Sequence, residues 1–506
     1  MELRDSYDAI VIGAGHNGLS AAAALAKAGK SVVVLERSNT VGGMIGRDEG
    51  RLAHLIYNMS EKERRRLGLQ TKLMALDTIS LSPDGAPVVI GSGGQVLTNG
   101  RTHPLSDRHV ALIKRLTRFA ALLAPMAEAP PPAFADGMFS RSGLRELMRL
   151  GTLGIGLKRL GKADMREFLR VLLSNAYDLV RDELGDNPLS GALAADAVRG
   201  AYAGPRSPGT VFGLMYRLGQ GGQIYAPVGG MQVVASAYAA AATEAGAEVA
   251  LGTGVERIVI EGDRATGVVT SNGQTVAARA VLSSAGPMQT RTMTGVAHHD
   301  AETVRRARNH RAKGAAAKVN FKLKNLPDFA GLTGDQVFQR LVIAPDPDYV
   351  ERSFNPAKYG ELPDNPVLEM VVTGEGGAAW LSAVVTHVPT EPVGGWTKAA
   401  RAKLLKTVTA TIETYAPGFG ELVAGSTLIT PADIRDTHGA PGGHWHHGEM
   451  GLDQVLTLRP IIGMSRYRAG PAGLYLCGAS AHPGGDITGA PGRNAAKAAL
   501  EDGVSS

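Results

Sequence analysis

Residues 7–36 of the chain read YDAIVIGAGHNGLSAAAALAKAGKSVVVLE. Residues 7–12 form an apolar run of strand length, and residues 19–28 form an alanine-rich segment with the composition of a helix. Residues 31–35 are a second short apolar run, and Glu36 follows it directly. Short apolar runs of this kind are typical of buried parallel strands, so this part of the sequence predicts a strand–turn–helix–strand unit.

The turn of this unit, GAGHNG at 13–18, has the glycine spacing of a dinucleotide-binding fingerprint. In that fingerprint Gly13 allows a tight turn, Gly15 lets the backbone approach a pyrophosphate, and Gly18 lets helix and strand pack closely. Glu36, 21 positions after Gly15, can accept hydrogen bonds from ribose hydroxyls. An ordinary glycine turn before a helix is the alternative, but it does not explain an acid at this distance. The candidate cofactor-binding residues of this unit are Gly13, Ala14, Gly15, Asn17, Gly18, Glu36 and Arg37.

A second glycine pair follows in the segment RSNTVGGM at 37–44. A paired glycine so soon after the ribose-binding acid is typical of FAD-binding flavoproteins rather than of simple NAD dehydrogenases, because it lets a second loop close over the pyrophosphate. We therefore expect FAD as the cofactor, with Gly42, Gly43 and Met44 among its binding residues. A plain turn after the second strand is the alternative.

The composition is that of a globular protein, since 44% of the 506 residues are hydrophobic and 20% are charged. A chain of this length exceeds one ordinary core, so we expect two or more lobes. No apolar run reaches the roughly 18 residues of a membrane-spanning helix, and the first apolar segment lacks the basic flank of a signal peptide. We expect a cytoplasmic protein, with peripheral contact to the inner face of a membrane as a further expectation.

Charge and cysteine content exclude other classes of protein. The 53 basic and 47 acidic residues leave a net charge of +6, spread too thinly for the dense basic stripe of a nucleic-acid-binding protein. We therefore expect no nucleic-acid partner. The single cysteine, Cys477, excludes an intrachain disulfide and a flavoenzyme that relays electrons through a pair of thiols.

The order of patterns along the chain predicts a discontinuous domain organisation. Helical patterns occupy residues 106–200, and dinucleotide-domain character returns after them. The predicted segments are 1–70, 223–290 and 440–506 for an FAD-binding domain, 71–105, 206–222 and 291–439 for a substrate-binding domain, and 106–205 for a helical cap. The substrate-binding part has strand candidates at 318–323, 368–372 and 382–387 and a helix candidate at 397–415.

The helical cap is basic between residues 141 and 170, where eight Lys or Arg residues oppose three acidic ones. Leucine, isoleucine and methionine residues lie between the charges, so the segment is amphipathic. One interpretation is a helix whose apolar face packs in the core while its charges face water. The other is a basic amphipathic helix that rests on an anionic membrane surface.

A further glycine-rich loop lies near the C-terminus, in GLYLCGASAHPGGDITGA at 473–490. An apolar strand leads into this loop, and a helix is predicted from about residue 488 to 500. The positive end of that helix would stabilise an anionic reduced flavin ring. A carboxylate beside the ring would oppose this effect, so we expect Asp486 to point away, toward a ribityl hydroxyl or backbone amides. The candidate cofactor-binding residues here are Gly478, Ala479, Gly485, Asp486 and Ile487, with Val255 at the adenine end.

These motifs resemble those of phytoene-desaturase-like FAD oxidoreductases, and in particular the branch of proteins called pyridine nucleotide-disulfide oxidoreductase domain proteins. The matching segments are residues 1–46, 203–210, 227–231, 452–460 and 475–494. The resemblance implies an α/β fold with a discontinuous Rossmann-like FAD-binding domain of the amine oxidase type, a mixed-sheet substrate domain and a helical cap over an apolar tunnel. Residues 45–50 depart from the pattern, because they lack the Phe-Asp motif of true carotene desaturases.

No second glycine fingerprint lies between a strand and a helix, which disfavours a bound NADPH as reductant. We expect an FAD-dependent oxidoreductase that dehydrogenates or isomerises a hydrophobic, isoprenoid- or lipid-like substrate by hydride transfer to flavin N5. Oxygen, a quinone or another acceptor would then reoxidise the flavin. An amine-oxidase-type flavoenzyme and a flavin-binding scaffold without turnover are the alternatives.

The candidate catalytic residues are His447 and Arg459. His447 lies in the polar segment GHWHHGE at 443–449 and matches the histidine-glycine pair of the branch, so it is the candidate base; holding a loop by hydrogen bonds is its alternative role. A zinc site at His444, His446 and His447 lacks a carboxylate or thiolate at matching spacing, so we expect no metal. Arg459 would anchor a carboxylate, face a flavin oxygen or form a structural ion pair.

Overall fold

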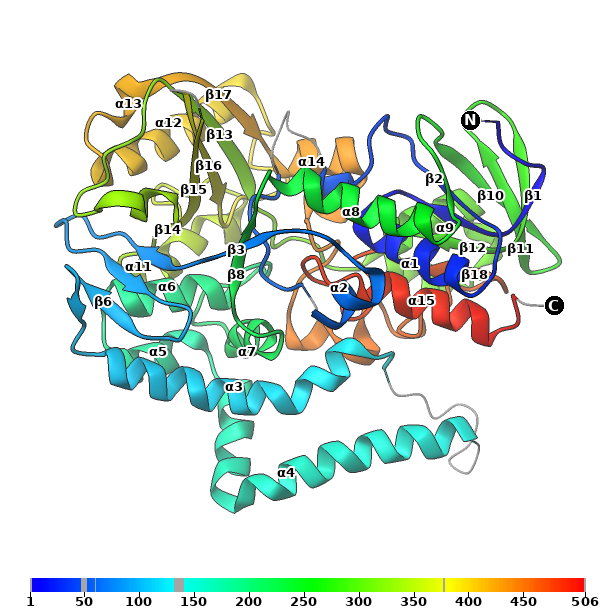
Figure 1. Cartoon of the computed structure of the whole chain (residues 1–506), viewed down its shortest axis with the longest axis horizontal. Coiled ribbons are helices and arrows are strands. Elements are labelled where there is room, and N and C mark those ends of the chain that lie inside the picture. Colours follow the sequence, from blue (N-terminus) through cyan, green and yellow to red (C-terminus); the bar gives the residue numbers. More distant parts are fainter. Residues whose placement is uncertain (1, 47–51, 60, 132–140, 376–377, 505–506) are drawn as a thin grey trace.

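The computed structural model describes residues 2–46, 52–59, 61–131, 141–375 and 378–504. Two large sheets lie toward opposite ends of the long axis, and a layer of helices runs below them in the view of Figure 1. Each sheet has its own hydrophobic core, and the helices have a third. We call these parts the seven-stranded lobe, the nine-stranded lobe and the helical lobe. Residues 47–50, part of the segment without the Phe-Asp motif, lie outside the described residues.

The seven-stranded lobe contains the unit predicted from residues 7–36. Its sheet has the order β10-β11-β12-β1-β2-β9, with β18 paired to β12. The strands are β1 (Ser6–Ile12), β2 (Val32–Leu35), β9 (Glu248–Ala250), β10 (Val255–Glu261), β11 (Arg264–Thr270), β12 (Thr275–Ser283) and β18 (Leu474–Leu476). β1 is parallel to both its neighbours, β2 and β12, which explains the apolar runs in the sequence. The helix α1 (His16–Lys27) contacts α8 (Met231–Glu244) and α15 (Ala490–Glu501).

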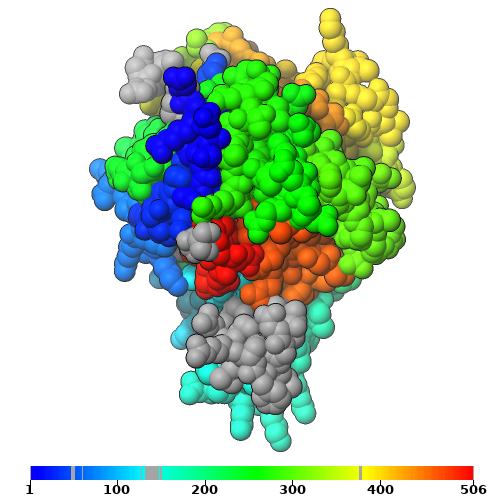
Figure 2. All heavy atoms as spheres, turned by 90° about the vertical axis from the view of Figure 1, so that its right-hand side faces the viewer, coloured from blue at the N-terminus to red at the C-terminus, as the bar shows by residue number. Residues whose placement is uncertain are grey.

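Segments far apart in the sequence build this lobe. β12 pairs with β1 on one side and with β18 on the other, so the middle of the chain lies between its two ends. Figure 2 shows the same arrangement on one face of the molecule, where the N-terminal residues in blue, the residues in green and the C-terminal residues in red lie side by side.

The nine-stranded lobe has a mixed sheet of order β17-β13-β16-β15-β14-β4-β5-β6-β7. Its strands are β4 (Thr78–Ser80), β5 (Val88–Ile90), β6 (Val96–Thr98), β7 (Arg101–Thr102), β13 (Ala317–Leu323), β14 (Arg340–Ile343), β15 (Leu368–Glu375), β16 (Ala378–Val385) and β17 (Val423–Ile429). Only β14 and β4 pair in parallel among these described strands. The helix α12 (Lys398–Tyr415) buries Leu404, Val408 and Ile412 in the core of this sheet. Shorter helices of the chain are α2 (Glu61–Leu67), α9 (Pro287–Thr294), α10 (Ala301–Arg308), α11 (Pro347–Phe354), α13 (Phe419–Leu422) and α14 (Pro431–His438).

The helical lobe has five helices among the described residues. They are α3 (Ser106–Glu128), α4 (Arg141–Leu173), α5 (Ala176–Leu184), α6 (Pro188–Ala197) and α7 (Val211–Gly219). α7 packs against α3, so residues 206–222, predicted with the substrate-binding domain, lie with the helices of the cap. Gly161 interrupts α4 with a φ of +80°, and the part of α4 before it runs along the lower edge of the molecule (Figures 1 and 2).

A two-stranded ribbon connects the lobes. β3 (Leu73–Leu76) pairs antiparallel with β8 (Ile224–Pro227), between the two large sheets (Figure 1). The sequence-based segmentation assigns β3 to the substrate-binding domain and β8 to the FAD-binding domain. The two segments therefore pair at the boundary between these domains.

Candidate functional site

The two N-terminal glycine loops meet at the carboxyl end of β1. Gly15 and Gly42 form an isolated parallel bridge, and the Gly42 N–H donates to the Ala14 carbonyl oxygen at 2.8 Å. A Cβ on Gly18 would overlap the Gly13 carbonyl oxygen, so helix and turn are in direct contact there. A Cβ on Gly15 would meet no protein atom within 4 Å. The space beside Gly15 is open, as expected where a ligand approaches the backbone.

Glu36 fixes the first loop from the end of β2. Its Oε2 accepts a hydrogen bond from the Ala14 N–H and its Oε1 accepts one from the Ser38 N–H, both at 2.8 Å. The acid therefore holds the glycine loop in place in addition to its predicted contact with a ribose, which remains a prediction.

A cavity of about 490 Å³ extends from Glu36 past both glycine loops to the nine-stranded lobe. The predicted cofactor-binding residues that line it are Gly13, Gly15, Asn17, Gly18, Glu36, Arg37, Gly42, Gly43, Met44, Val255, Gly478, Ala479, Asp486 and Ile487. Ala14 and Gly485 are not among the lining residues: Ala14 is buried beneath its loop, and Gly485 packs against Tyr216. The structure thus brings three separated parts of the sequence to one cavity.

The residues around this cavity fit FAD. α1 begins after Gly15 without a side-chain cap, so its first N–H groups are available to a pyrophosphate. Asn17 Oδ1 and His16 Nε2 are buried and have no hydrogen-bond partner in the described part of the chain, which is expected where a ligand supplies the missing partners. The glycine loops would hold the pyrophosphate, Glu36 the ribose, and the 478–487 loop the flavin. When bound, FAD supplies a two-electron acceptor for a hydride.

Asp486 lies in the C-terminal loop, where we expected contacts to a ribityl hydroxyl or to backbone amides. Among the described residues its carboxylate contacts side chains instead of backbone amides, and the contact to a ribityl hydroxyl stays a prediction. Its carboxylate accepts hydrogen bonds from Asn58 Nδ2 at 2.7 Å and Arg199 Nη1 at 3.0 Å, and it lies 3.1 Å from His446 Nε2. Burial alone would raise the pKa of Asp486, but Arg199 and His446 lower it overall. The carboxylate is therefore directed into a network of side chains and stays ionised.

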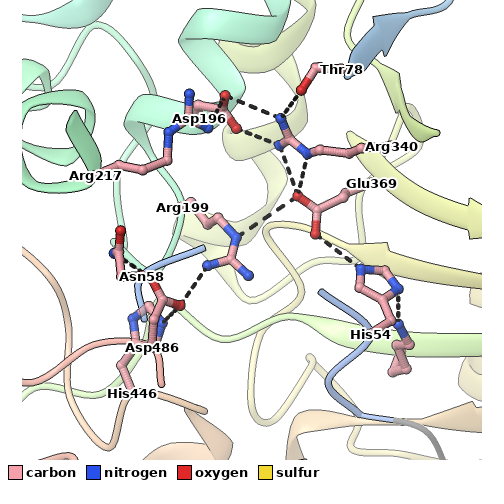
Figure 3. A network of polar contacts seen from close by, with 11 residues as sticks. His54, Asn58, Thr78, Asp196, Arg199, Arg217, Arg340, Glu369, His446 and Asp486 are labelled. Atoms are coloured by element: carbon pink, nitrogen blue, oxygen red, sulfur yellow. Dashed lines mark hydrogen bonds and ion pairs between the residues drawn. The ribbon is translucent and has the colours of Figure 1, made fainter. Parts of the chain in front are cut away.

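This network of buried charges joins the three lobes (Figure 3). Arg199 lies between Asp486 and Glu369, with its Nε 3.9 Å from Glu369 Oε2. Glu369 on β15 accepts hydrogen bonds from Arg340 on β14 at 2.8 and 3.1 Å, and Arg340 pairs in turn with Asp196 on α6. Burial would raise the pKa of Glu369, but Arg340 and Arg199 hold it well below the usual range. Opposite charges balance in this group: the cations are Arg199, Arg217 and Arg340, and the anions are Asp196, Glu369 and Asp486.

The network reaches the cavity again through His54 and Lys318, which both line it. His54 Nε2 lies 3.1 Å from Glu369 Oε1, and His54 Nδ1 lies 2.5 Å from Lys318 Nζ. Burial, with Lys318 next, lowers the pKa of His54 to about 4, so this ring is neutral at neutral pH. With the Lys318 ammonium donating to Nδ1, the ring hydrogen lies on Nε2 and faces Glu369.

His447 lines the cavity, as required of the candidate base. Its Nδ1 is buried without a hydrogen-bond partner among the described residues, and its φ of +53° is rare for a residue other than glycine. Burial, with the charge of Arg459 next, lowers the pKa of His447 to about 3, so the ring is neutral at neutral pH and its protonated form is disfavoured. In the neighbouring His444, the Nε2 atom lies 3.1 Å from the Gly200 carbonyl oxygen. Within the described ranges, no group of three His, Cys, Asp or Glu side chains is placed to hold a metal ion.

Arg459 lies outside the cavity lining and is fully buried. Its guanidinium donates to the carbonyl oxygens of Glu449 at 3.0 Å, His446 at 2.8 Å and Ala479 at 2.7 Å. Burial lowers the pKa of Arg459 to about 10, which leaves it charged at neutral pH. The side chain thus connects the histidine segment to the C-terminal glycine loop through main-chain atoms.

Several residues of the site escape sequence-based reasoning because they stand alone between apolar residues. Lys318 lies in the strand segment AKVNFKL and Glu369 in LEMVV, where each is a charged residue in a buried strand. A charged residue flanked by apolar neighbours within a strand is the signal that the sequence offers for them, because buried charges need partners. The sequence alone does not say which partners they have.

Fold and cavity together define a class of flavoprotein. The chain belongs to the FAD-dependent oxidoreductase family, since the family model described as FAD dependent oxidoreductase matches residues 8–310. The cofactor is therefore FAD, and the prediction from the paired glycines at 42 and 43 is confirmed.

Individual relatives agree with this assignment. The chain is 30% identical over 550 residues to pyridine nucleotide-disulfide oxidoreductase domain-containing protein 2 of Rattus norvegicus, covering 99% of this chain and 94% of the relative. It is 27% identical over 317 residues to phytoene dehydrogenase of Streptomyces griseus, covering 57% and 56% of the two chains. A triple mutant of putrescine oxidase, 16% identical, covers 98% of both chains with a TM-score of 0.57 and shares the fold. The resemblance and the fold class predicted from the sequence are thus confirmed.

Proposed function

We propose that this FAD-dependent oxidoreductase introduces a carbon–carbon double bond into, or isomerises, a hydrophobic substrate of isoprenoid or lipid type. The observation that carries the proposal is the apolar lining of the cavity beyond the glycine loops. The apolar residues there are Leu52, Ala53, Leu55, Ala316 and Val384. An apolar substrate gains free energy in such a space by leaving water. The similarity to a phytoene dehydrogenase supports the same class of substrate.

In this proposal the substrate loses a hydride from one carbon and a proton from the next, and a double bond forms between them. His447 takes the proton, because its ring lines the cavity and its Nδ1 has no hydrogen-bond partner among the described residues. Arg459 acts as a positioning residue, since it holds the main chain at His446 and Ala479. Oxygen or a quinone is the proposed final electron acceptor.

The test uses the purified FAD-loaded protein and the lipid that co-purifies with it. That lipid is extracted, identified by mass spectrometry and mixed with the protein without oxygen while the absorbance of the flavin is followed. Bleaching of the flavin and a product two hydrogens lighter support dehydrogenation, and recovery of colour with oxygen or a quinone identifies the acceptor. Bleaching by a primary amine instead would favour the amine oxidase alternative. A flavin that dithionite reduces but no acceptor reoxidises would favour a scaffold.

The base is tested in the same assay. His447→Gln removes the proton acceptor and is expected to slow flavin reduction by about 100-fold, within the range for general base catalysis. His438→Gln is the matched control, because His438 lines the same cavity from α14. Equal rates of flavin reduction in wild type and His447→Gln would reject the assignment.

We also propose that α4 rests on an anionic membrane surface. Met148 and Ile155 are 62% and 52% exposed although apolar, and Lys158 and Arg159 follow them on the helix. No helix among the described residues is long and apolar enough to cross a membrane. The side chains of residues 141–146 and 149–150, which include three of the basic residues counted above, lie outside the described part. Flotation with vesicles containing phosphatidylglycerol tests the contact, and binding that neither salt nor Ile155→Glu reduces would refute it.

A further inference from the structure

Arg199 lies on the wall between two cavities. It follows α6 in the chain, and its side chain lines both the cavity of about 490 Å³ and a second cavity of about 30 Å³. Trp445 also lines both. The smaller cavity lies between the helical and nine-stranded lobes and has room for about two water molecules. A group bound to Arg199 would therefore sit where the two cavities meet.

The guanidinium of Arg199 is held in place on three sides. The ring of Tyr57 lies 3.6 Å from its carbon atom, the ring of Trp445 lies 5.4 Å away, and Asp486 accepts the hydrogen bond from Nη1. Burial would lower the pKa of Arg199, but Tyr57 and Asp486 raise it overall, so the group stays charged. The planar group is thus fixed in orientation before any ligand arrives.

One edge of this guanidinium has no partner in the described chain. Nη1 makes the only hydrogen bond of the group, and Nε is too far from Glu369 for one, at 3.9 Å. Figure 3 shows Nη2 directed away from both Asp486 and Glu369, with no contact to the residues drawn. The Arg199 side chain is 22% exposed, and its Nη2 atom is not fully buried. A fixed arginine with an accessible edge is suited to bind two oxygens of a planar anion.

The charged side chains around Arg199 favour a carboxylate over a phosphate. Arg199 and Lys318 line the cavity with Asp486, and the rings of His54 and His446 line it beside them. Asp486 and, behind it, Glu369 offset part of the attraction of Arg199 and Lys318, so the site suits an anion with one charge better than a dianion such as a phosphate. A carboxylate has one negative charge and the planar geometry of the guanidinium edge.

We propose that the substrate end of the cavity binds an amphipathic carboxylic acid, with the carboxylate on the Nη2 edge of Arg199 and the hydrocarbon chain among Leu52, Leu55 and Val384. The inference deepens the proposed function, on which it rests, because it adds an acidic head group to the hydrophobic substrate. Arg199 is then the residue that selects acids over neutral lipids, and Trp445 and Tyr57 keep its guanidinium in position.

The probes are decanoate and 1-decanol, which share a hydrocarbon chain and differ in the head group. Calorimetric titration of the FAD-loaded protein is expected to show decanoate binding at least tenfold more tightly than 1-decanol. Arg199→Gln should weaken decanoate binding by about 10- to 100-fold, the range expected when a charge-assisted hydrogen-bond pair is lost, and should change 1-decanol binding less than twofold. Arg199→Lys keeps the positive charge but lacks the planar guanidinium. Its affinity for decanoate should lie between those of the wild type and Arg199→Gln.

Arg206→Gln is the matched control. Arg206 also stacks on a tyrosine, Tyr177 at 3.7 Å, and pairs with Asp348, but it lies on the surface. The variant Arg206→Gln should leave the binding of decanoate and of 1-decanol unchanged. Equal affinity of the wild type for decanoate and 1-decanol would overturn the inference, and so would unchanged decanoate binding in Arg199→Gln. Preference for decanoate without flavin reduction by any extracted lipid would support this inference and remove the proposed function, so the two fail separately.

Discussion

Replacing Gly15 by alanine separates the packing of the protein from its contact with the cofactor. The backbone of Gly15, at φ −70° and ψ 162°, suits alanine, and the new Cβ would meet no protein atom within 4 Å. The free energy of unfolding of the FAD-free protein should therefore change by less than about 0.5 kcal/mol. The methyl group would occupy the space through which the backbone approaches the pyrophosphate, and it would lengthen hydrogen bonds worth about 1.5–3 kcal/mol each. We expect FAD to bind about tenfold more weakly, which corresponds to about 1.4 kcal/mol.

Gly18→Ala is the matched comparison, because its Cβ would overlap the Gly13 carbonyl oxygen. This overlap should cost the FAD-free protein about 1–3 kcal/mol and should weaken FAD binding as well. Urea unfolding of both FAD-free variants measures the first quantity, and the quenching of flavin fluorescence on binding measures the second. The reasoning is refuted if Gly15→Ala destabilises the FAD-free protein as much as Gly18→Ala, or if it binds FAD with wild-type affinity.

Three further predictions concern stability. Glu369→Gln should lower the free energy of unfolding by about 3–5 kcal/mol in urea, because it removes a buried anion, while Glu302→Gln in an exposed ion pair should leave it nearly unchanged. Arg459→Lys should lower the free energy of unfolding by about 3 kcal/mol in the same assay, since lysine cannot reach all three carbonyl groups. A loss below about 1 kcal/mol would contradict the structural role of these three hydrogen bonds. The third prediction concerns the buried histidines His54 and His447, whose pKa values are lowered to about 4 and about 3. As the pH drops from about 6.5 toward 4, these side chains take up protons in the unfolded chain before they do in the folded protein. The free energy of unfolding should therefore fall over this range, by up to about 1.4 kcal/mol per pH unit for each histidine. Equal stability at pH 7 and pH 5 would refute the last prediction.

Local patterns in the sequence predict the parts of the fold that depend on neighbouring residues. The strand–turn–helix unit follows from the glycines at 13, 15 and 18, because each has a steric role within a few residues of chain. The strand candidate at 318–323 and the helix candidate at 397–415 match β13 and α12 within one residue at each end. These elements have apolar patterns that point to one structure at every position.

The charged network could not be predicted in the same way, because its members come from five separated segments. Asp486 illustrates the reason: we expected a ribityl hydroxyl or backbone amides as its partners, but Arg199, 287 residues earlier in the chain, donates a hydrogen bond to it. The position of α7 was not predicted for a similar reason. Its apolar face packs on α3, which lies far before it in the sequence, so the spacing of residues near α7 does not show where it packs. Long-range pairing of this kind depends on the finished packing rather than on spacing in the sequence.

The ribbon of β3 and β8 limits how the molecule can open. Both strands cross between the two large sheets, and backbone hydrogen bonds join them along their length. A swing of one sheet against the other must therefore bend two joined strands at once, which is stiffer than bending a single linker. The ribbon would thus keep the spacing between the two sheets, and with it the length of the cavity that they both line, close to constant.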